Sequence, residues 1–166
     1  MQHFYAPWRD MYHAKQPALK DACVFCTMST HPERDAEQYV IARFPQSILV
    51  CNIFPYNPGH LMVIPLRHIA ALEKLSSSEH AELMYVASQG IKLLRRTLKM
   101  KAFNIGMNLG GKLAGGSIPR HLHMHIVPRY TGDTGFLTVL CATRQVATDI
   151  PKLCARLRAA YQMMAK

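Results

Sequence analysis

Three histidines at every second position are the residues whose types and spacing most directly predict chemistry in this chain. They form the run His121-Leu122-His123-Met124-His125-Ile126-Val127. In an extended strand, alternate side chains lie on the same face, so the three imidazoles would share one face and the apolar residues the other. Because an unpaired buried polar group is costly, the histidine face must meet water, a metal ion or a ligand.

The histidine run alone allows three interpretations. The run is a polar strand face without chemistry, a zinc or copper site in which His121, His123 and His125 all bind the metal, or a catalytic imidazole array. A glycine-rich segment, Gly110 to Gly116, precedes the run and ends at Ser117. Its backbone N–H groups could hold an anionic phosphate beside the histidines, which favours the catalytic array.

A second block is rich in turn residues and leads into a short apolar run. It reads Asn52-Ile53-Phe54-Pro55-Tyr56-Asn57-Pro58-Gly59-His60-Leu61-Met62-Val63-Ile64-Pro65, followed by Arg67-His68. Together with the histidine run, this block resembles the histidine triad (HIT) family of nucleotide hydrolases and transferases, over residues 20–130. The segments Ala6-Pro7-Trp8-Arg9 and Gly132-Asp133-Thr134-Gly135-Phe136 resemble a bacterial branch that includes diadenosine tetraphosphate phosphorylase-like proteins.

The resemblance implies a nucleophile and its partners. The middle histidine of the family falls on His123, which would attack the α-phosphorus of a nucleoside polyphosphate, above all a diadenosine polyphosphate. The covalent nucleotidyl-histidine would then pass its nucleotide to water or phosphate. Neutral imidazole is nucleophilic near pH 7 and can leave phosphorus again, so one difficult displacement becomes two easier ones. His125 and His60 would donate hydrogen bonds to phosphate oxygens or to the leaving group.

The resemblance also implies nucleotide contacts. Asn52 would bind the ribose hydroxyls and Ile53 would lie against the base. The resemblance to diadenosine polyphosphate enzymes implies an adenine nucleotide as substrate. Asn108 would contact phosphate or ribose, and Ser117 would contact phosphate. For Asn57, ordinary turn chemistry is the favoured interpretation.

A C-x2-C pair, Cys23 and Cys26, allows a redox pair, two buried thiols or half of a zinc site. The zinc-bearing members of the family imply the third, with Cys23, Cys26, His68 and His121 as ligands. Four protein ligands close a tetrahedral site, so the zinc would be structural. The remaining cysteines (Cys51, Cys141 and Cys154) are interpreted as buried small hydrophobes, and the remaining histidines (His3, His13, His31 and His80) as surface residues.

The pattern of apolar and turn residues predicts the elements that carry these side chains. Strands are expected over 38–42, 48–54, 61–66, 102–108 and 121–127. Ser76 and Glu79 form a capping box before an amphipathic helix of about five turns, and a final helix is expected over 149–164. Strands and helices without regular alternation indicate an α+β fold. The resemblance implies a single HIT domain over 1–166 with an antiparallel sheet, an N-terminal arm and a C-terminal helix.

Composition narrows the class of protein. The 166 residues are 49% hydrophobic, which is typical of a globular domain with one core. No apolar run approaches the roughly 20 residues that span a bilayer, and the N-terminal residues lack an apolar signal region. An odd count of five cysteines without an export signal disfavours a disulfide framework. We therefore expect a cytoplasmic protein with no membrane partner.

The net charge of +10 favours anionic partners without choosing among them. The basic residues late in the long helix (Lys92, Arg95, Arg96 and Lys99) are interpreted as a solvated face that suits the helix dipole. The expected partner is a nucleotide, nucleic acid is not expected, and the resemblance implies a homodimer. Two rival functions are kept: a zinc hydrolase with a three-histidine metal site, and a non-catalytic nucleotide or nucleic-acid binding module.

Overall fold

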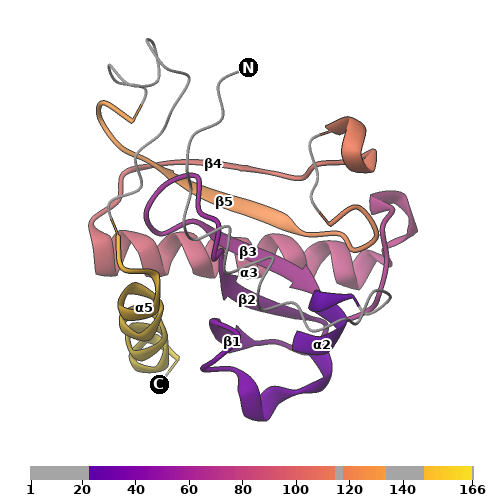
Figure 1. Cartoon of the computed structure of the whole chain (residues 1–166), viewed down its shortest axis with the longest axis horizontal. Coiled ribbons are helices and arrows are strands. Elements are labelled where there is room, and N and C mark those ends of the chain that lie inside the picture. Colours follow the sequence, from indigo (N-terminus) through magenta and orange to yellow (C-terminus); the bar gives the residue numbers. More distant parts are fainter. Residues whose placement is uncertain (1–22, 115–117, 134–147, 166) are drawn as a thin grey trace, which may run out of the picture.

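The computed structural model describes residues 23–114, 118–133 and 148–165. Its centre is a five-stranded antiparallel sheet in the order β1-β2-β3-β5-β4 (Figure 1). The strands are β1 (Val40–Arg43), β2 (Ser47–Cys51), β3 (Leu61–Pro65), β4 (Ala102–Gly106) and β5 (Met124–Arg129). The strand that carries His125 is therefore flanked on both sides.

In the part of the chain that the structure describes, three α-helices pack around this sheet, with short 3-10 turns in the connections. The α-helices are α2 (Val24–Thr30), α3 (Ser77–Leu98) and α5 (Ile150–Met164), and the 3-10 turns are η1 (Pro32–Arg34), η2 (Leu72–Lys74) and η3 (Gly111–Ala114). Helix α3 runs along one face of the sheet, and α5 packs beside β1 and the end of α3 (Figure 1). The α+β class predicted from the sequence is confirmed.

Alternation along the central strands gives the sheet two apolar faces. Leu49 and Val63 belong to the larger core cluster, together with Leu94 of α3 and Leu157 of α5. The neighbouring residues Ile48, Val50, Met62 and Ile64 face the other way and pack around Phe25 of α2. Because Met62 pairs with His125 in the sheet, the His125 side chain lies on the α2 face.

Helix α3 begins as the sequence predicts. The Ser76 side chain accepts from the Glu79 backbone, and the Glu79 side chain accepts from the Ser76 backbone. The helix then approaches β5 closely at Gly90, where an added Cβ would lie 2.9 Å from Cδ1 of Ile126. The final helix also begins as predicted, with Asp149 as its N-cap.

Strand boundaries are where the sequence predictions need correction. The strand predicted over 121–127 begins only at Met124, because the Leu122 N–H bonds to the carbonyl of Ile69 in a loop. Strand β1 begins at Val40, after Tyr39 with φ 60°, and β2 ends at Cys51. Strands β3 and β4 end at Pro65 and Gly106, slightly before the predicted ends.

The predicted environments of the remaining cysteines and histidines hold where the structure describes them. Cys51 and Cys154 are buried, while His31 and His80 are exposed. Cys141, His3 and His13 lie outside the described residues, as do the segments that resemble the bacterial branch apart from Gly132 and Asp133. Within the described ranges, no helix has the length and apolar character needed to cross a membrane.

A candidate active site and metal centre

Four rings form a continuous row on the α2 face of the sheet. Tyr56 stacks on His60 with ring centroids 4.9 Å apart, and His60 lies 5.1 Å from His125. The His125 ring meets His123 edge-on at 4.9 Å. Tyr56 and His60 come from the loop between β2 and β3, whereas His125 comes from β5 and His123 immediately precedes it. The fold therefore gathers the imidazoles of His60, His123 and His125.

The hydrogen bonds around His60 assign its protons. Its Nδ1 accepts from the backbone N–H of Tyr56 at 3.1 Å and from the side-chain amide of Asn52 at 3.2 Å. That amide is oriented because the Asn52 side-chain oxygen accepts from the Phe54 N–H at 2.8 Å. In a neutral imidazole the other nitrogen then carries the proton. The Nε2–H of His60 thus donates to Nδ1 of His125, 3.0 Å away.

This arrangement leaves His125 with a proton on Nε2. The Nε2 atom is buried and finds no hydrogen-bond acceptor among the described residues. Burial, followed by the neighbouring histidines, lowers the pKa of His60 to about 3. Burial and the charge of His123 lower the pKa of His125 to about 4. Both rings are therefore neutral near pH 7, and His125 presents an unused N–H donor.

His123 is oriented by its own backbone neighbourhood. Its Nδ1 lies 2.9 Å from the carbonyl oxygen of His121. Since a carbonyl can only accept, Nδ1 carries the proton and Nε2 holds the free lone pair. Burial also lowers the pKa of His123, which favours the neutral ring. A neutral imidazole with an oriented lone pair is chemically a nucleophile or a base.

The side chain of His121 belongs to a second cluster. Its Nε2–H donates to the carbonyl of Pro65 at 2.8 Å, so Nδ1 is left with a lone pair. That Nδ1 lies 3.3 Å from Sγ of Cys23 and 3.6 Å from Sγ of Cys26, and Nδ1 of His68 lies 3.1 Å from Cys26 Sγ. The four ligand atoms lie within 4.8 Å of one another. These four residues are the predicted metal ligands.

The cluster fits a tetrahedral metal ion. Zinc bonds of about 2.3 Å to sulfur and about 2.0 Å to nitrogen separate tetrahedral ligand atoms by roughly 3.5 Å. The observed sulfur–nitrogen separations of 3.1, 3.3 and 3.6 Å bracket that value. Within the described ranges, His121, His123 and His125 do not form such a cluster. His121 directs Nδ1 toward Cys23 and donates its Nε2–H to Pro65, so neither of its nitrogens is left for an ion shared with His123 and His125.

Phe25 connects the two clusters. It lies between Cys23 and Cys26 in the sequence and is 2% exposed. Its ring meets His121 at 5.5 Å and His123 at 5.1 Å, both edge-on. Helix α2, which contains Cys26 and begins directly after Cys23, therefore also packs against the candidate nucleophile through Phe25.

The four residues predicted to bind the nucleotide are placed unequally. Asn52 lies beside His60, with one N–H and one oxygen lone pair already used. Ile53 follows it and is half-buried. Asn108 lies two residues beyond β4, whose last residue pairs with His125. Ser117 lies outside the described residues.

Some residues of the site were missed by the sequence analysis. Tyr56 stacks on His60, and Asn57 is 5% exposed rather than an ordinary surface turn residue. Asn57 binds Asp133, which the sequence analysis noted only as part of a resemblance. The C-x-F-C spacing could have identified Phe25, since it places an apolar ring between two candidate ligands. Nothing local to Asn57 or Asp133 indicates their contact, because they are far apart in sequence.

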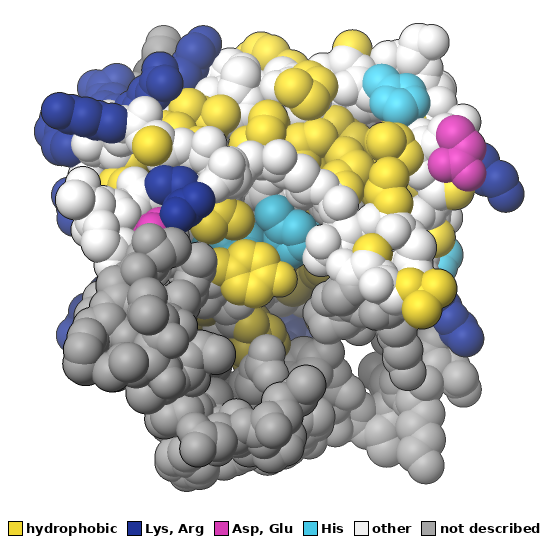
Figure 2. Space-filling model, turned by 90° about the horizontal axis from the view of Figure 1, so that it is seen from above, with side chains coloured by type: hydrophobic (Ala, Val, Ile, Leu, Met, Phe, Trp, Pro, Cys, Tyr) yellow, Lys and Arg dark blue, Asp and Glu magenta, His cyan; other side chains and the backbone are white. Residues whose placement is uncertain are grey.

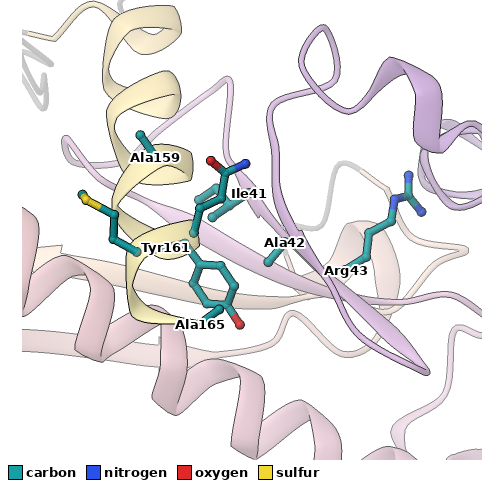
Figure 3. A pocket seen from close by; sticks show the side chains of 8 residues that line it. Ile41, Ala42, Arg43, Ala159, Tyr161 and Ala165 are labelled. Carbon is teal, nitrogen blue, oxygen red and sulfur yellow. The ribbon is translucent and has the colours of Figure 1, made fainter.

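The molecular surface shows the histidines on one face and a hollow at a different place. Figure 2 shows a histidine side chain near the middle of one face, with hydrophobic side chains around it and Lys and Arg side chains gathered toward one corner. A separate hollow of about 710 Å³ lies between β1 and α5, lined in part by Ile41, Arg43 and Tyr161 (Figure 3). Its one charged lining residue, Arg43, is bound to Asp35. No histidine, cysteine or carboxylate is among the described residues that line this hollow.

Comparison with known proteins places the chain in a family. The HIT domain profile matches residues 33–132. The chain is 36% identical to the AP-4-A phosphorylase of Mycobacterium tuberculosis, over 93% of this chain and 83% of that protein. It is 34% identical to the asymmetrical bis(5'-nucleosyl)-tetraphosphatase of Schizosaccharomyces pombe, over 57% of this chain and 50% of that protein.

A solved structure of a histidine triad family protein has a similar fold. The zinc-bound histidine triad family protein of Mycobacterium smegmatis superposes with a TM-score of 0.69 and 27% identity, covering 87% of this chain and 96% of that one. The profile covers more than half of the chain, and the M. tuberculosis relative aligns with nearly all of it. The chain therefore belongs to the HIT family.

Proposed function

We propose that this protein is a nucleotidyl hydrolase or transferase that cleaves a diadenosine polyphosphate through a covalent nucleotidyl-His123. The observation that carries the proposal is the orientation of His123, whose Nδ1–H is held by the His121 carbonyl at 2.9 Å so that Nε2 keeps its lone pair. Two of the enzymes similar to this chain are named for reactions of AP-4-A and of bis-nucleosyl tetraphosphates, which supports this substrate class.

The first step is an in-line displacement at the α-phosphorus. The Nε2 lone pair of His123 forms the N–P bond while the bond to the leaving polyphosphate breaks. The ring becomes positively charged, and the hydrogen bond from Nδ1 to the His121 carbonyl strengthens as this charge develops. Inorganic phosphate, or water that gives up one proton to the solvent, then attacks the same phosphorus, and the bond to His123 breaks. The neutral imidazole is restored after the second displacement.

His125 and His60 stabilise the transition state in this proposal. The Nε2–H of His125 is the donor without an acceptor among the described residues, so it is free to bind an oxygen of the phosphate or of the leaving group. His60 fixes this proton on Nε2 because its own Nε2–H occupies Nδ1 of His125. The two rings thus supply an oriented hydrogen-bond donor at neutral charge.

Four further residues complete the proposed nucleotide site. Asn52 retains one N–H and one lone pair for the ribose hydroxyls, although its main contacts hold His60. We assign the base contact to Ile53, and phosphate or ribose contacts to Asn108 and Ser117.

We further propose that Cys23, Cys26, His68 and His121 hold a structural zinc ion. The solved M. smegmatis relative is described as zinc-bound, and the donor set and spacing here fit zinc. A bound zinc ion would supply a cross-link rather than a reactive water, because four protein ligands fill its tetrahedral shell. Sulfur ligands in an X-ray absorption spectrum would support this site, whereas a shell of histidines alone would favour the three-histidine hydrolase.

The assembly is proposed to be a homodimer of single HIT domains spanning 1–166. Strand β4 lies at the edge of the sheet, and most of it is exposed, including Ile105 at 44%. An exposed edge strand with apolar side chains favours pairing with another strand. Light scattering should give twice the chain mass, and Ile105→Lys should shift the protein toward monomer.

The decisive test of the proposed function is turnover of diadenosine tetraphosphate with and without inorganic phosphate. Phosphate-dependent release of ADP and ATP indicates transfer of the nucleotide to phosphate, and release of AMP and ATP without phosphate indicates hydrolysis. Absence of both products, with binding of the dinucleotide retained, would instead support the binding-module alternative. Strong salt-sensitive binding to polynucleotide would favour a nucleic-acid partner.

A further inference from the structure

Asp133 is the centre of a partly buried hydrogen-bond network at the end of β5. Its carboxylate accepts two bonds from Arg129, at 2.5 and 2.8 Å, and its side chain is only 7% exposed. The Tyr130 N–H donates to the same carboxylate at 3.3 Å. Arg129 also donates to the Asn104 side chain at 2.8 Å, so the fork ties the turn after β5 to strand β4.

The network continues into the loop that carries His60. The Asn57 side-chain amide donates to Asp133 at 2.9 Å and to the carbonyl of Pro128 at 2.8 Å. The Asn57 carbonyl in turn accepts from the backbone N–H of His60 at 3.0 Å. Asn57 therefore links the two residues: its side chain binds the Asp133 carboxylate, and its backbone carbonyl binds the His60 N–H.

Two more contacts hold the same turn. The Tyr130 hydroxyl donates to the carbonyl of Pro58 at 2.8 Å. Gly59 has φ +83°, and an added Cβ there would lie 2.9 Å from Leu98 and 3.3 Å from Pro128. The turn from Asn57 to His60 is thus clamped between the end of β5 and helix α3.

We propose that Asp133 is a positioning residue for catalysis, which acts through Asn57 to fix the His60 ring and so the proton on His125. His60 must meet the Tyr56 N–H at one nitrogen and His125 at the other, 3.1 and 3.0 Å away. A small displacement of the loop breaks one of these bonds. The Nδ1 atom of His125 then loses its donor, and the ring no longer holds its proton only on Nε2.

The carboxylate is required because each described group that bonds to it is a donor. Arg129, Asn57 and the Tyr130 N–H all point hydrogens at its two oxygens. The Arg129 guanidinium keeps the pKa of Asp133 below its usual range, so the group is ionised throughout the neutral range. An amide at this position would turn an N–H toward at least one donor, which weakens the clamp without changing its size.

The chain contains a matched control for this network. Asp35 accepts a similar fork from Arg43, at 2.6, 3.0 and 3.1 Å, at the other end of the sheet. Asp35→Asn should weaken a structural fork of the same chemistry without touching the His60 loop. Its comparison with Asp133→Asn separates positioning of the site from general stabilisation.

The inference rests on the proposed function, so its test compares kcat and KM for diadenosine tetraphosphate in the two variants, at a temperature where both are folded. We expect Asp133→Asn to lower kcat by at least about tenfold with KM within about threefold, because misplaced catalytic groups cost rate rather than ground-state binding. Asp35→Asn should keep kcat within about twofold. Unchanged kcat in Asp133→Asn, or equal losses in both variants, would overturn the inference.

A second variant and a second measurement keep the inference testable if Asp133→Asn does not fold or if the wild type has no turnover. If Asp133→Asn does not fold, Asn57→Ala removes the side chain that links Asp133 to the His60 loop and leaves the Arg129–Asp133 ion pair in place. This variant should give the same loss of kcat. Nitrogen-15 spectra of the imidazoles should show mixed protonation of His125 in either variant and a single tautomer in Asp35→Asn. If the wild type turns over no nucleotide, the proposed function fails, and these spectra alone decide the positioning role: a single His125 tautomer in every variant overturns it.

Discussion

His123 donates a hydrogen bond from Nδ1 to the backbone carbonyl oxygen of His121 at a distance of 2.9 Å. The side chain of His121 meanwhile directs its own Nδ1 toward Cys23, 3.3 Å away. One residue therefore takes part in both clusters, orienting the proposed nucleophile with its backbone and belonging to the Cys2His2 cluster with its ring. A change that moves His121 must therefore affect both the orientation of His123 and the Cys2His2 cluster.

Removal of metal from the proposed centre should mainly lower stability. The four donor atoms lie within 4.8 Å of one another. Without a metal ion, no coordinate bonds join the cysteines at α2 to His68 and His121. Chelation should lower the melting temperature by several degrees, at about 2–4 °C per kcal/mol for a chain of this size. Calorimetry checks this, and Cys26→Ser should show the same loss with no further effect of chelator. Complete loss of turnover at an unchanged melting temperature would contradict the structural role.

Acid should destabilise the protein through His60. Burial lowers its native pKa to about 3 from an ordinary 6.5, so the unfolded chain takes up a proton below pH 6.5 while the native ring does not. The free energy of unfolding should fall by about 1 kcal/mol per pH unit between roughly pH 6 and 4 from this residue. Urea titrations of wild type and His60→Gln give this contribution as the difference of their pH slopes. Parallel pH profiles would show that His60 is not held neutral.

Gly59 should resist substitution because both its backbone and its surroundings require glycine. Its φ is +83°, and Leu98 and Leu94 lie 2.9 and 3.2 Å from the position of an added Cβ. Gly59→Ala should cost about 1–3 kcal/mol of stability, measured by denaturant unfolding. Gly106→Ala is the control, since nothing lies within 4 Å of its added Cβ. Equal stability of the two variants would argue against a clamped loop.

The fold could be predicted from the sequence where local pattern decides structure. The capping box at Ser76 and the spacing of apolar residues after it predicted α3, and the final helix predicted over 149–164 agrees with α5. The alternation of histidines with apolar residues predicted that the side chains of His125 and Leu122 lie on opposite sides of the sheet. The start of β5 could not be predicted in this way, because the Leu122 N–H bonds to Ile69, a contact that no local pattern shows.

Some residues of the candidate site could likewise be predicted from local spacing, and others could not. Side chains with a short repeat, such as the three histidines or the two cysteines, could be found from spacing and from the family resemblance. Asn57 lies in a segment with the composition of a turn, and it is held by Pro128 and Asp133, which are more than 70 residues away in the sequence. The proton on each imidazole also depends on tertiary contacts, so it follows from the structure alone.

The most direct test of the central claim is chemical trapping of the intermediate. Diadenosine tetraphosphate is mixed with the enzyme, quenched in alkali within one turnover and analysed by peptide mass spectrometry. The account predicts one adenylyl group on the peptide that contains His123, labile in acid because a phosphorus–nitrogen bond holds it, and absent from a folded His123→Ala variant that has lost turnover. Full turnover by His123→Ala, or rapid turnover with no adenylyl group on that peptide, would contradict it.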